Sequence, residues 1–258
     1  MRLKAFVLSF LSVSVLTSIL HAGPPDSQGT AVLVQSLSVA GGAYGLNRIQ
    51  DFTATGSITY FWAGEQVQGA ATVRARGADQ FRLDANLPEG TRSYAVNLVA
   101  GAFKDTDGNV TAIPSHNTLN VGVLTFPYLT LLARLNDPLT AVSYLGVTPL
   151  VRGPAHQVRV ERHFSSDTPD STLANLCTTD YFVDAQTFLL LKTLDMTHPV
   201  ETLTENYTRE IEFQNYQPLN GVNVPTLVRE KIAGQTTWEL RLTSIALNTG
   251  LTDFDFTL

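Results

Sequence analysis

Cysteine is almost absent from this sequence, because Cys177 is the only one among 258 residues. A single thiol cannot form a disulfide within the chain, so the fold must be stabilised by its core without covalent cross-links. Cys177 has no histidine near it in the sequence. We therefore interpret it as a buried small residue and not as a nucleophile.

Charge is also scarce, since charged residues make up only 16% of the chain and acidic ones outnumber basic ones by 23 to 17. An acidic balance argues against nucleic acid and against anionic membrane surfaces as partners. No G-x-S-x-G elbow, phosphate-cradling glycine loop, HExxH or paired-carboxylate motif is present. We predict no catalytic residue, no cofactor and no metal site, so the chain is not expected to be an enzyme.

Long apolar runs are missing except at the start, where Arg2 and Lys4 precede an apolar stretch from Ala5 to Leu20. Four serines and a threonine dilute this stretch, which favours a secretory signal peptide over a transmembrane helix. We predict a signal peptide over residues 1–22 and one mature domain over residues 23–258; a retained anchor is the alternative. With no cysteine near the cleavage region, the exported protein is not expected to be lipidated, and we predict a periplasmic location.

Histidine and acidic clusters give little sign of metal. His156 and His163 lie seven residues apart on one expected strand and so point to opposite faces. His116 and His198 have no partner at ligand spacing. The segment from Asp105 to Asn109 resembles the start of a calcium loop, but its glycine is misplaced, so we interpret it as a hairpin tip.

Alternation of apolar and polar residues dominates the rest of the chain and predicts roughly 11 to 13 strands. The connections between them are too short for parallel crossovers, so the fold class is mainly β, with one antiparallel, strongly curved sheet. The expected strands run over Phe52 to Trp62, Val67 to Arg76, Phe81 to Leu87, Ser93 to Leu98, Ala102 to Lys104, Val110 to Ile113, Ala141 to Val151, Ala155 to Phe164, Thr179 to Val183, Leu189 to Thr197, Thr208 to Gln217, Val222 to Ile232 and Thr236 to Leu247.

Two segments depart from this alternation. Thr30 to Ile49 has helical spacing, although Gly41 and Gly42 weaken or split the helix. Leu124 to Leu135 is apolar nearly all round, with Thr125 as its expected N-cap and Pro127 placed early. A helix without a polar face must be covered on several sides, or must itself cover something apolar. Ser165 to Leu176 is expected to be a polar loop.

The order of these elements resembles the LolA/LolB-like superfamily of lipoprotein carriers and lipid-binding proteins. Three segments are similar to elements of that family: AGGAYGLNRIQDFTATGSITY at the entry, VDAQTFLLLK at a hairpin and FQNYQPLNGVNVPTLV near the end. The resemblance spans roughly residues 30 to 250. It implies an unclosed, half β-barrel with an N-terminal helix and a mid-chain lid helix. The family's concave face is apolar and shields an acyl chain from water.

A sheet with one apolar face must bury that face, and the two helical segments are the elements available to cover it. The sequence leaves open whether they fill the concave side or roof a cavity. In the second case we expect the lipid to be bound by apolar side chains of the first and third strands and of the lid. These ligand-binding candidates are Phe52, Ile58, Tyr60, Trp62, Phe81, Leu83, Leu124, Phe126, Leu129 and Leu132; each of them also fits a plain core position.

Three functions remain open. The first is a periplasmic carrier or binding protein for a lipid or an acylated protein, with an envelope protein as a further partner and no stable membrane insertion. The second is an exported β-scaffold that binds a protein partner without a lipid cavity. The third is an outer-membrane β-barrel, suggested by the alternation of Phe254, Phe256 and Leu258 at the C-terminus, as in a closing strand.

Overall fold

The computed structural model describes residues 26–119, 124, 126–163, 176–199 and 202–258. The predicted signal peptide, Thr125 and most of the expected loop Ser165 to Leu176 lie outside the described residues. Within them, no helix has the length and hydrophobicity needed to cross a bilayer.

Thirteen strands form one antiparallel sheet that is not closed into a barrel, as the sequence predicts. Their order is β6-β5-β4-β3-β2-β1-β13-β12-β11-β10-β9-β8-β7, so β6 and β7 are the two edges and β1 pairs with β13 between the two halves. The strands are β1 (Asp51–Trp62), β2 (Glu65–Arg76), β3 (Gln80–Leu87), β4 (Gly90–Asn97), β5 (Ala100–Lys104), β6 (Val110–Ile113), β7 (Thr140–Leu150), β8 (Gly153–Arg162), β9 (Thr178–Asp184), β10 (Leu190–Thr197), β11 (Tyr207–Leu219), β12 (Val222–Ile232) and β13 (Gln235–Leu247).

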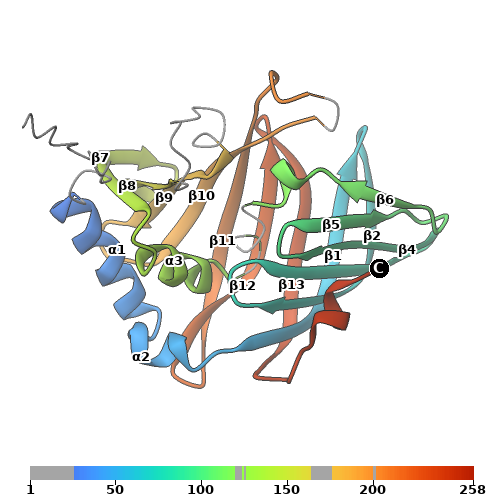
Figure 1. Cartoon of the computed structure of the whole chain (residues 1–258), viewed down its shortest axis with the longest axis horizontal. Coiled ribbons are helices and arrows are strands. Elements are labelled where there is room, and N and C mark those ends of the chain that lie inside the picture. Colours follow the sequence, from blue (N-terminus) through green and yellow to red (C-terminus); the bar gives the residue numbers. More distant parts are fainter. Residues whose placement is uncertain (1–25, 120–123, 125, 164–175, 200–201) are drawn as a thin grey trace, which may run out of the picture.

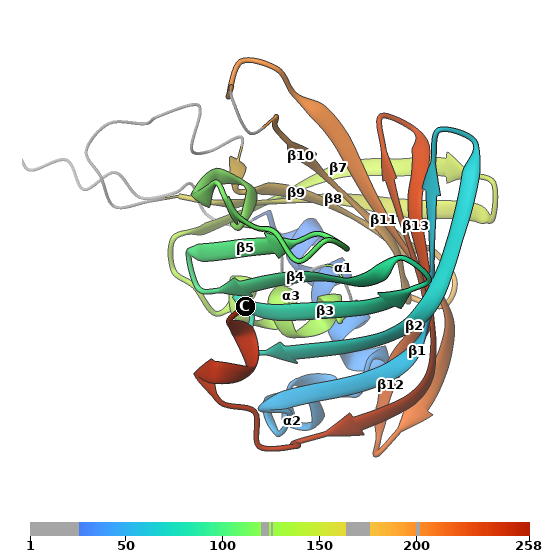
Figure 2. The same ribbon diagram turned by 90° about the vertical axis from the view of Figure 1, so that its right-hand side faces the viewer.

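The sheet bends strongly, and the helices lie inside the curve (Figures 1 and 2). They are α1 (Ser27–Val39), α2 (Gly42–Asn47) and α3 (Pro127–Leu135), with short 3-10 turns η1 (Ser115–Asn117) and η3 (Asp253–Phe256). The expected split at Gly41 and Gly42 is confirmed, because positive φ at Gly41, the N-cap of α2, and at Gly42, its first residue, separates α1 from α2. The predicted mid-chain helix is confirmed but starts later than expected, because its N-cap is Phe126 and not Thr125 and Pro127 is its first residue.

Helix α1 spans the concave side because both its ends are tied to the sheet. At its start, Asp26 caps the helix through the Gln28 N–H and also accepts a 2.9 Å hydrogen bond from the Tyr144 N–H on the edge strand β7. At its end, the Asn223 side chain donates to the Val39 carbonyl at 2.7 Å. These contacts satisfy helix-end groups and hold α1 across the sheet.

The C-terminal segment is not a strand, so the expectation of a closing strand is wrong. Residues Asp253–Phe256 form the turn η3, in which Phe256 is 2% exposed and Phe254 is 87% exposed. Phe256 packs under the Arg76 guanidinium, whose carbon lies 5.7 Å from the ring centroid. Local hydrogen bonds between Thr252 and Asp255 cap the turn and override the alternation of aromatic residues.

Asp51 anchors this C-terminal segment to β1. Its buried carboxylate accepts hydrogen bonds from the Thr249 N–H and hydroxyl and from the Gly250 and Leu251 N–H groups. Burial alone raises the pKa of Asp51, but these donors outweigh it and hold the pKa below its ordinary value of 3.8. The carboxylate therefore stabilises the fold above about pH 4, and this stability is lost as the pH falls toward the lowered native value.

We expect Asp51→Asn to lower the free energy of unfolding by about 2 kcal/mol at pH 7, because the amide nitrogen cannot accept from the N–H groups that the second carboxylate oxygen binds. Urea unfolding at pH 7 and at pH 3.5 measures the effect, and the difference from wild type should shrink at the lower pH. Asp107→Asn, at an exposed hairpin tip, is the matched control. Equal losses in both variants would contradict the anchoring role.

Candidate functional site

The concave face of the sheet is one continuous apolar surface. A cross-strand row from β1 to β11 shows this, since Ile58 lies opposite Leu240, Leu240 opposite Val228, and Val228 opposite Phe213. All four side chains are at most 1% exposed. They belong to a single hydrophobic cluster that also includes buried residues of α1, α2 and α3.

The structure brings together most of the residues that the sequence proposed for ligand binding. Eight of them are buried in this one cluster: Phe52, Ile58, Phe81, Leu83, Leu124, Phe126, Leu129 and Leu132. Tyr60 is half-buried and packs against the cluster. Trp62, the last residue of β1, does not join the cluster and is 73% exposed.

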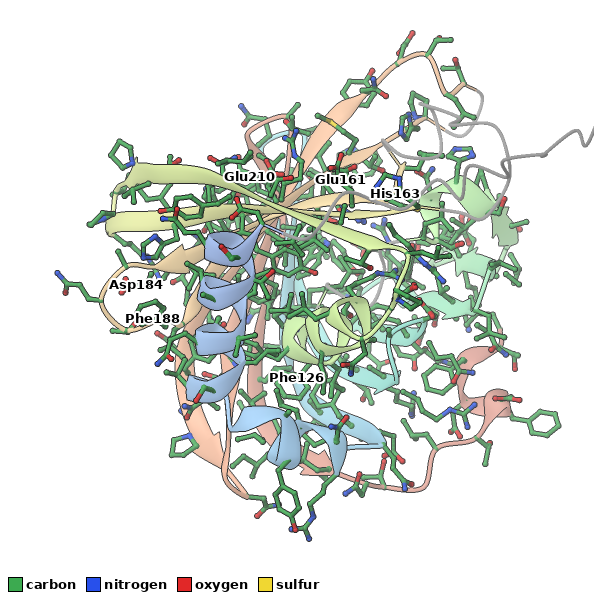
Figure 3. The ribbon with its side chains drawn as sticks, turned by 60° about the vertical axis from the view of Figure 1, so that its left-hand side comes forward. Phe126, Glu161, His163, Asp184, Phe188 and Glu210 are labelled. Atoms are coloured by element: carbon green, nitrogen blue, oxygen red, sulfur yellow. The ribbon has the colours of Figure 1, made fainter. Side chains whose placement is uncertain are left out.

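Helix α3 fills the middle of the concave side with aromatic rings (Figure 3). Phe126 lies 6.0 Å from Phe52 of β1 and 6.4 Å from Tyr128, and Tyr128 lies 6.1 Å from Tyr216 of β11, all between ring centroids. Two pockets, of about 370 and 190 Å³, lie elsewhere on the sheet, and no residue of the helices lines them. In this structure the helices therefore pack onto the apolar face, and a ligand there would take their place.

Two tyrosines hold α3 to a break in the sheet. The pairing of β9 with β10 shifts register after Leu190. The Leu190 N–H donates to the Tyr128 hydroxyl at 2.9 Å, and the Tyr216 hydroxyl donates to the Leu190 carbonyl at 2.7 Å. Burial raises the pKa of both tyrosines, so the hydroxyls stay protonated. This tyrosine pair satisfies backbone groups that the bulge frees and attaches the helix through one of them.

Charged groups also occupy the concave face, which the sequence did not predict. Arg209 of β11 makes two hydrogen bonds, of 2.8 and 2.6 Å, to Asp195 of β10, and both residues are buried. Burial alone would lower the pKa of Arg209, but Asp195 raises it. Glu230 of β12 is buried nearby and accepts a 2.5 Å hydrogen bond from the Thr237 hydroxyl; burial raises the pKa of this carboxyl.

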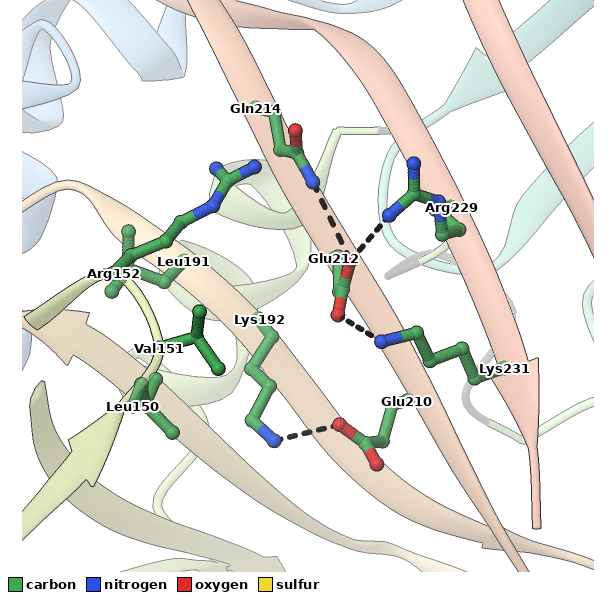
Figure 4. Close-up of a pocket in the computed structure, with 10 residues that line it drawn as sticks. All are labelled: Leu150, Val151, Arg152, Leu191, Lys192, Glu210, Glu212, Gln214, Arg229 and Lys231. Carbon is green, nitrogen blue, oxygen red and sulfur yellow. Dashed lines mark hydrogen bonds and ion pairs between the residues drawn. The ribbon is translucent and has the colours of Figure 1, made fainter. Parts of the chain in front are cut away.

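The outer face carries a ladder of ion pairs around the larger pocket (Figure 4). Lys192 bonds Glu210 at 2.6 Å, and Glu212 accepts from Lys231 at 2.5 Å and from Arg229 at 3.3 Å. Glu210 and Glu212 alternate with buried residues of β11 and therefore share this outer face. Each of these carboxylates is paired with a lysine or arginine on a neighbouring strand, and such cross-strand pairs stabilise the outer surface of a sheet.

His116 and His198, which have no partner at ligand spacing in the sequence, lie together in the structure. Their ring centroids are 5.9 Å apart, because the Asn117 side chain exchanges two hydrogen bonds with the His198 backbone. His198 Nδ1 faces the Glu205 carbonyl at 3.1 Å. No group of three or more His, Cys, Asp or Glu residues suited to a metal ion occurs in the described part of the chain. The sequence carries no signal for this contact, since 81 residues separate Asn117 from His198.

Cys177 and Asp105 behave as expected, whereas His163 does not share the strand of His156, which ends at Arg162. Cys177 is buried, and burial raises the pKa of its thiol, as for a core residue. Asp105 accepts hydrogen bonds from the N–H and the side-chain amide of Asn109, which closes the predicted hairpin tip. His156 stacks on Phe188, while His163 lies exposed after the end of β8.

Comparison with known proteins gives no match to a family model and none to a curated protein sequence. Solved structures do match over nearly the whole chain. One is an outer membrane lipoprotein-sorting protein domain, assigned as putative, from Vibrio parahaemolyticus (13% identity, TM-score 0.53, 89% of this chain and 96% of that one). Another is a LolA superfamily protein from Nitrosomonas europaea (12% identity, TM-score 0.54, 89% and 97%). The chain has the LolA-like fold.

A DUF1329 family protein from Desulfovibrio piger shares this fold as well, at 10% identity and a TM-score of 0.51 over 89% of this chain and 97% of that one. The resemblance inferred from the sequence is therefore confirmed at the level of the fold. At such identities a LolA-like fold does not by itself assign a ligand, so function is argued from the concave face.

Proposed function

We propose that this chain is a non-enzymatic carrier or binding protein that takes up an acyl chain or a similar lipid between its helices and the concave face of the sheet. One observation carries the proposal. The apolar inner face of an open sheet is covered by three helices of at most 13 residues and not by a second sheet. The lipoprotein-sorting domain with the same fold agrees with this chemistry.

Ligand and helices compete for the same apolar surface in this proposal. Each methylene removed from water contributes about 0.8 kcal/mol, so a chain of about fourteen carbons contributes on the order of 10 kcal/mol. That gain can replace the contacts of α3, which has only nine residues. The eight buried candidates and Tyr60 would line the ligand, while Trp62 would lie at the exposed end of the face.

The remaining features of the proposal concern export. Cleavage after residue 22 would release residues 23–258 into the periplasm without a lipid anchor. The ligand would be a free lipid or an acylated protein, delivered to or from an envelope protein. The acidic mature chain, with a net charge of −8, would associate with neither nucleic acid nor an anionic bilayer.

A second candidate is the exported scaffold that binds a protein partner. It is favoured by the packed interior together with the fully exposed Val151 at the tip of the β7–β8 hairpin, beside the outer pocket. Lipid extraction and native mass spectrometry of the purified mature chain separate the two candidates. Co-purified lipid, or saturable binding of a hydrophobic fluorescent probe, supports the carrier; neither in the wild-type chain contradicts it.

Releasing α3 should strengthen lipid binding. Tyr128→Phe leaves the buried Leu190 N–H without its acceptor, which costs the closed form about 1–2 kcal/mol. The ligand and α3 compete for the same surface, and in the variant α3 is held to that surface less tightly. The affinity for the probe should therefore rise by up to about tenfold. Tyr207→Phe, which removes an exposed hydroxyl, is the control and should change little. Unchanged affinity in Tyr128→Phe would argue against α3 as the covering element.

A further inference from the structure

Two arginines face the concave side of the sheet, and they differ in their partners. Arg209 is neutralised by Asp195. Arg92 of β4 lies in the same cross-strand row as the buried Ala85 and Ala71, which places it on the concave face. The Arg92 backbone pairs in the sheet opposite Ala85, but in the part of the chain that the structure describes its guanidinium makes no hydrogen bond and no ion pair.

Aromatic rings hold Arg92 in place instead. Its guanidinium carbon lies 4.6 Å from the ring centroid of Tyr60 on β1 and 4.8 Å from that of Phe103 on β5. Arg92 reaches Tyr60 across β2 and β3, where the concave residues Gly69, Ala71 and Ala85 are small. Rings against the guanidinium fix its plane and leave its N–H donors, which lie in that plane, for another group.

The surroundings favour an anion at these donors. A guanidinium offers five N–H groups in a fork that matches the two oxygens of a carboxylate or phosphate. Two acids of the concave face already have partners, since Asp195 is bonded to Arg209 and Glu230 accepts from the Thr237 hydroxyl.

Arg92 also marks the boundary between the polar and apolar parts of the concave face. Along β4 the inward residues run from Arg92 through Tyr94 to Val96, which is fully buried. Tyr94 contacts Phe81 with ring centroids 6.2 Å apart, and Phe81 belongs to the apolar cluster. A group bound at Arg92 therefore lies next to the surface proposed to hold an alkyl chain.

We propose that Arg92 binds the anionic head group, a carboxylate or a phosphate, of an amphiphile whose alkyl chain occupies the apolar interior. This inference rests on the proposed function and narrows its ligand to anionic lipids. The aromatic pair Tyr60 and Phe103 positions the guanidinium, and the cluster between the helices and the sheet takes the chain. Lipids with the same chain and a neutral head group lack a partner for Arg92.

Ligand pairs with the same chain test this directly. Displacement of a hydrophobic fluorescent probe measures the affinity of the mature protein for each lipid. The first pair is oleate and oleyl alcohol at pH 8.5, and the second is 1-oleoyl lysophosphatidic acid and monoolein. Wild type should bind each anionic member about tenfold more tightly than its neutral match. Arg92→Met, which keeps much of the length and apolar bulk, should remove this preference and leave binding of the neutral lipid within about twofold. Arg92→Lys, which keeps the charge but loses the fork, should retain part of it.

Lys104→Met is the matched control, because Lys104 lies opposite Ser93, one residue from Arg92 on β4, and therefore faces the outer side. It removes one positive charge from the same region and should keep the full preference. Thermal unfolding of each variant confirms that it is folded. Inorganic phosphate, tested alone as a competitor, should not displace the probe at millimolar concentration.

The outcomes separate this inference from the proposed function. Equal affinity of wild type for the anionic and neutral lipids, or an unchanged preference in Arg92→Met, overturns the head-group site and leaves the lipid carrier intact. Phosphate alone binding as tightly as the phospholipid overturns the amphiphile as ligand. If wild type binds none of the four lipids, the inference and the carrier function are both overturned.

Discussion

Replacing Asp195 with alanine is expected to lower the free energy of unfolding by about 3–5 kcal/mol. The substitution leaves the Arg209 guanidinium buried without its bidentate partner, and an uncompensated buried charge is among the most destabilising changes in a protein. Glu230, which also raises the pKa of Arg209, compensates part of the loss. Urea unfolding at pH 7 measures the effect.

Two further variants show whether burial is the cause. Asp180→Ala removes the partner of Arg159, whose side chain is 42% exposed against 9% for Arg209, so water can replace the carboxylate and the loss should stay near 1 kcal/mol. The double variant Asp195→Leu, Arg209→Met should recover most of the stability, because an apolar pair needs no desolvation of charge. A loss below 1 kcal/mol in Asp195→Ala would show that Arg209 reaches water.

Phe126→Ala is expected to cost about 3–5 kcal/mol of unfolding free energy. Its ring is 1% exposed and fills the space between Phe52 and Tyr128, so its removal loses both transfer free energy and packing. Under the proposed function the same variant should bind acyl chains more tightly, because the ligand enters vacated volume and need not displace the ring. Denaturant unfolding and probe titration measure the two effects.

Phe254→Ala is the control for this substitution, because it truncates the same residue type where the ring is 87% exposed. It should change stability by less than 0.5 kcal/mol and leave probe binding unchanged. A destabilised Phe126→Ala with weaker probe binding than wild type would mean that the contacts between this ring and the ligand outweigh the volume that its removal vacates.

The strands could be predicted from the sequence because each one has its own local pattern of alternating residues and turn residues. Thr53, Thr55 and Thr59 alternate with apolar residues of β1, and turn residues such as Asn220 and Gly221, both at positive φ, mark the hairpins. The order of these strands and the apolar segment around Phe126 suffice to suggest the LolA-like fold. Most of the candidate lining follows in turn, since the inward face of a strand is set by its period of two.

The features that the sequence did not show have a different cause. Trp62 has the same parity as the buried Ile58, yet it ends β1 and is 73% exposed, and no local pattern records where the buried part of a strand stops. The aromatic alternation at the C-terminus is genuine, but hydrogen bonds between Thr252 and Asp255 turn it into η3. The contact of His116 with His198 depends on Asn117 meeting the end of β10.

Composition and periodicity alone are thus enough to establish a disulfide-free, antiparallel, curved β-protein with an apolar inner face and an apolar helix to cover it. Only the tertiary structure shows that this helix packs onto the inner face through Tyr128 and that Asp195 neutralises Arg209. It also shows that the Arg92 guanidinium contacts aromatic rings and, among the described residues, pairs with no acidic side chain. The physical reason is curvature: residues on strands β1 and β4 meet across the bend of the sheet, and a pattern read along the chain contains no distance between them.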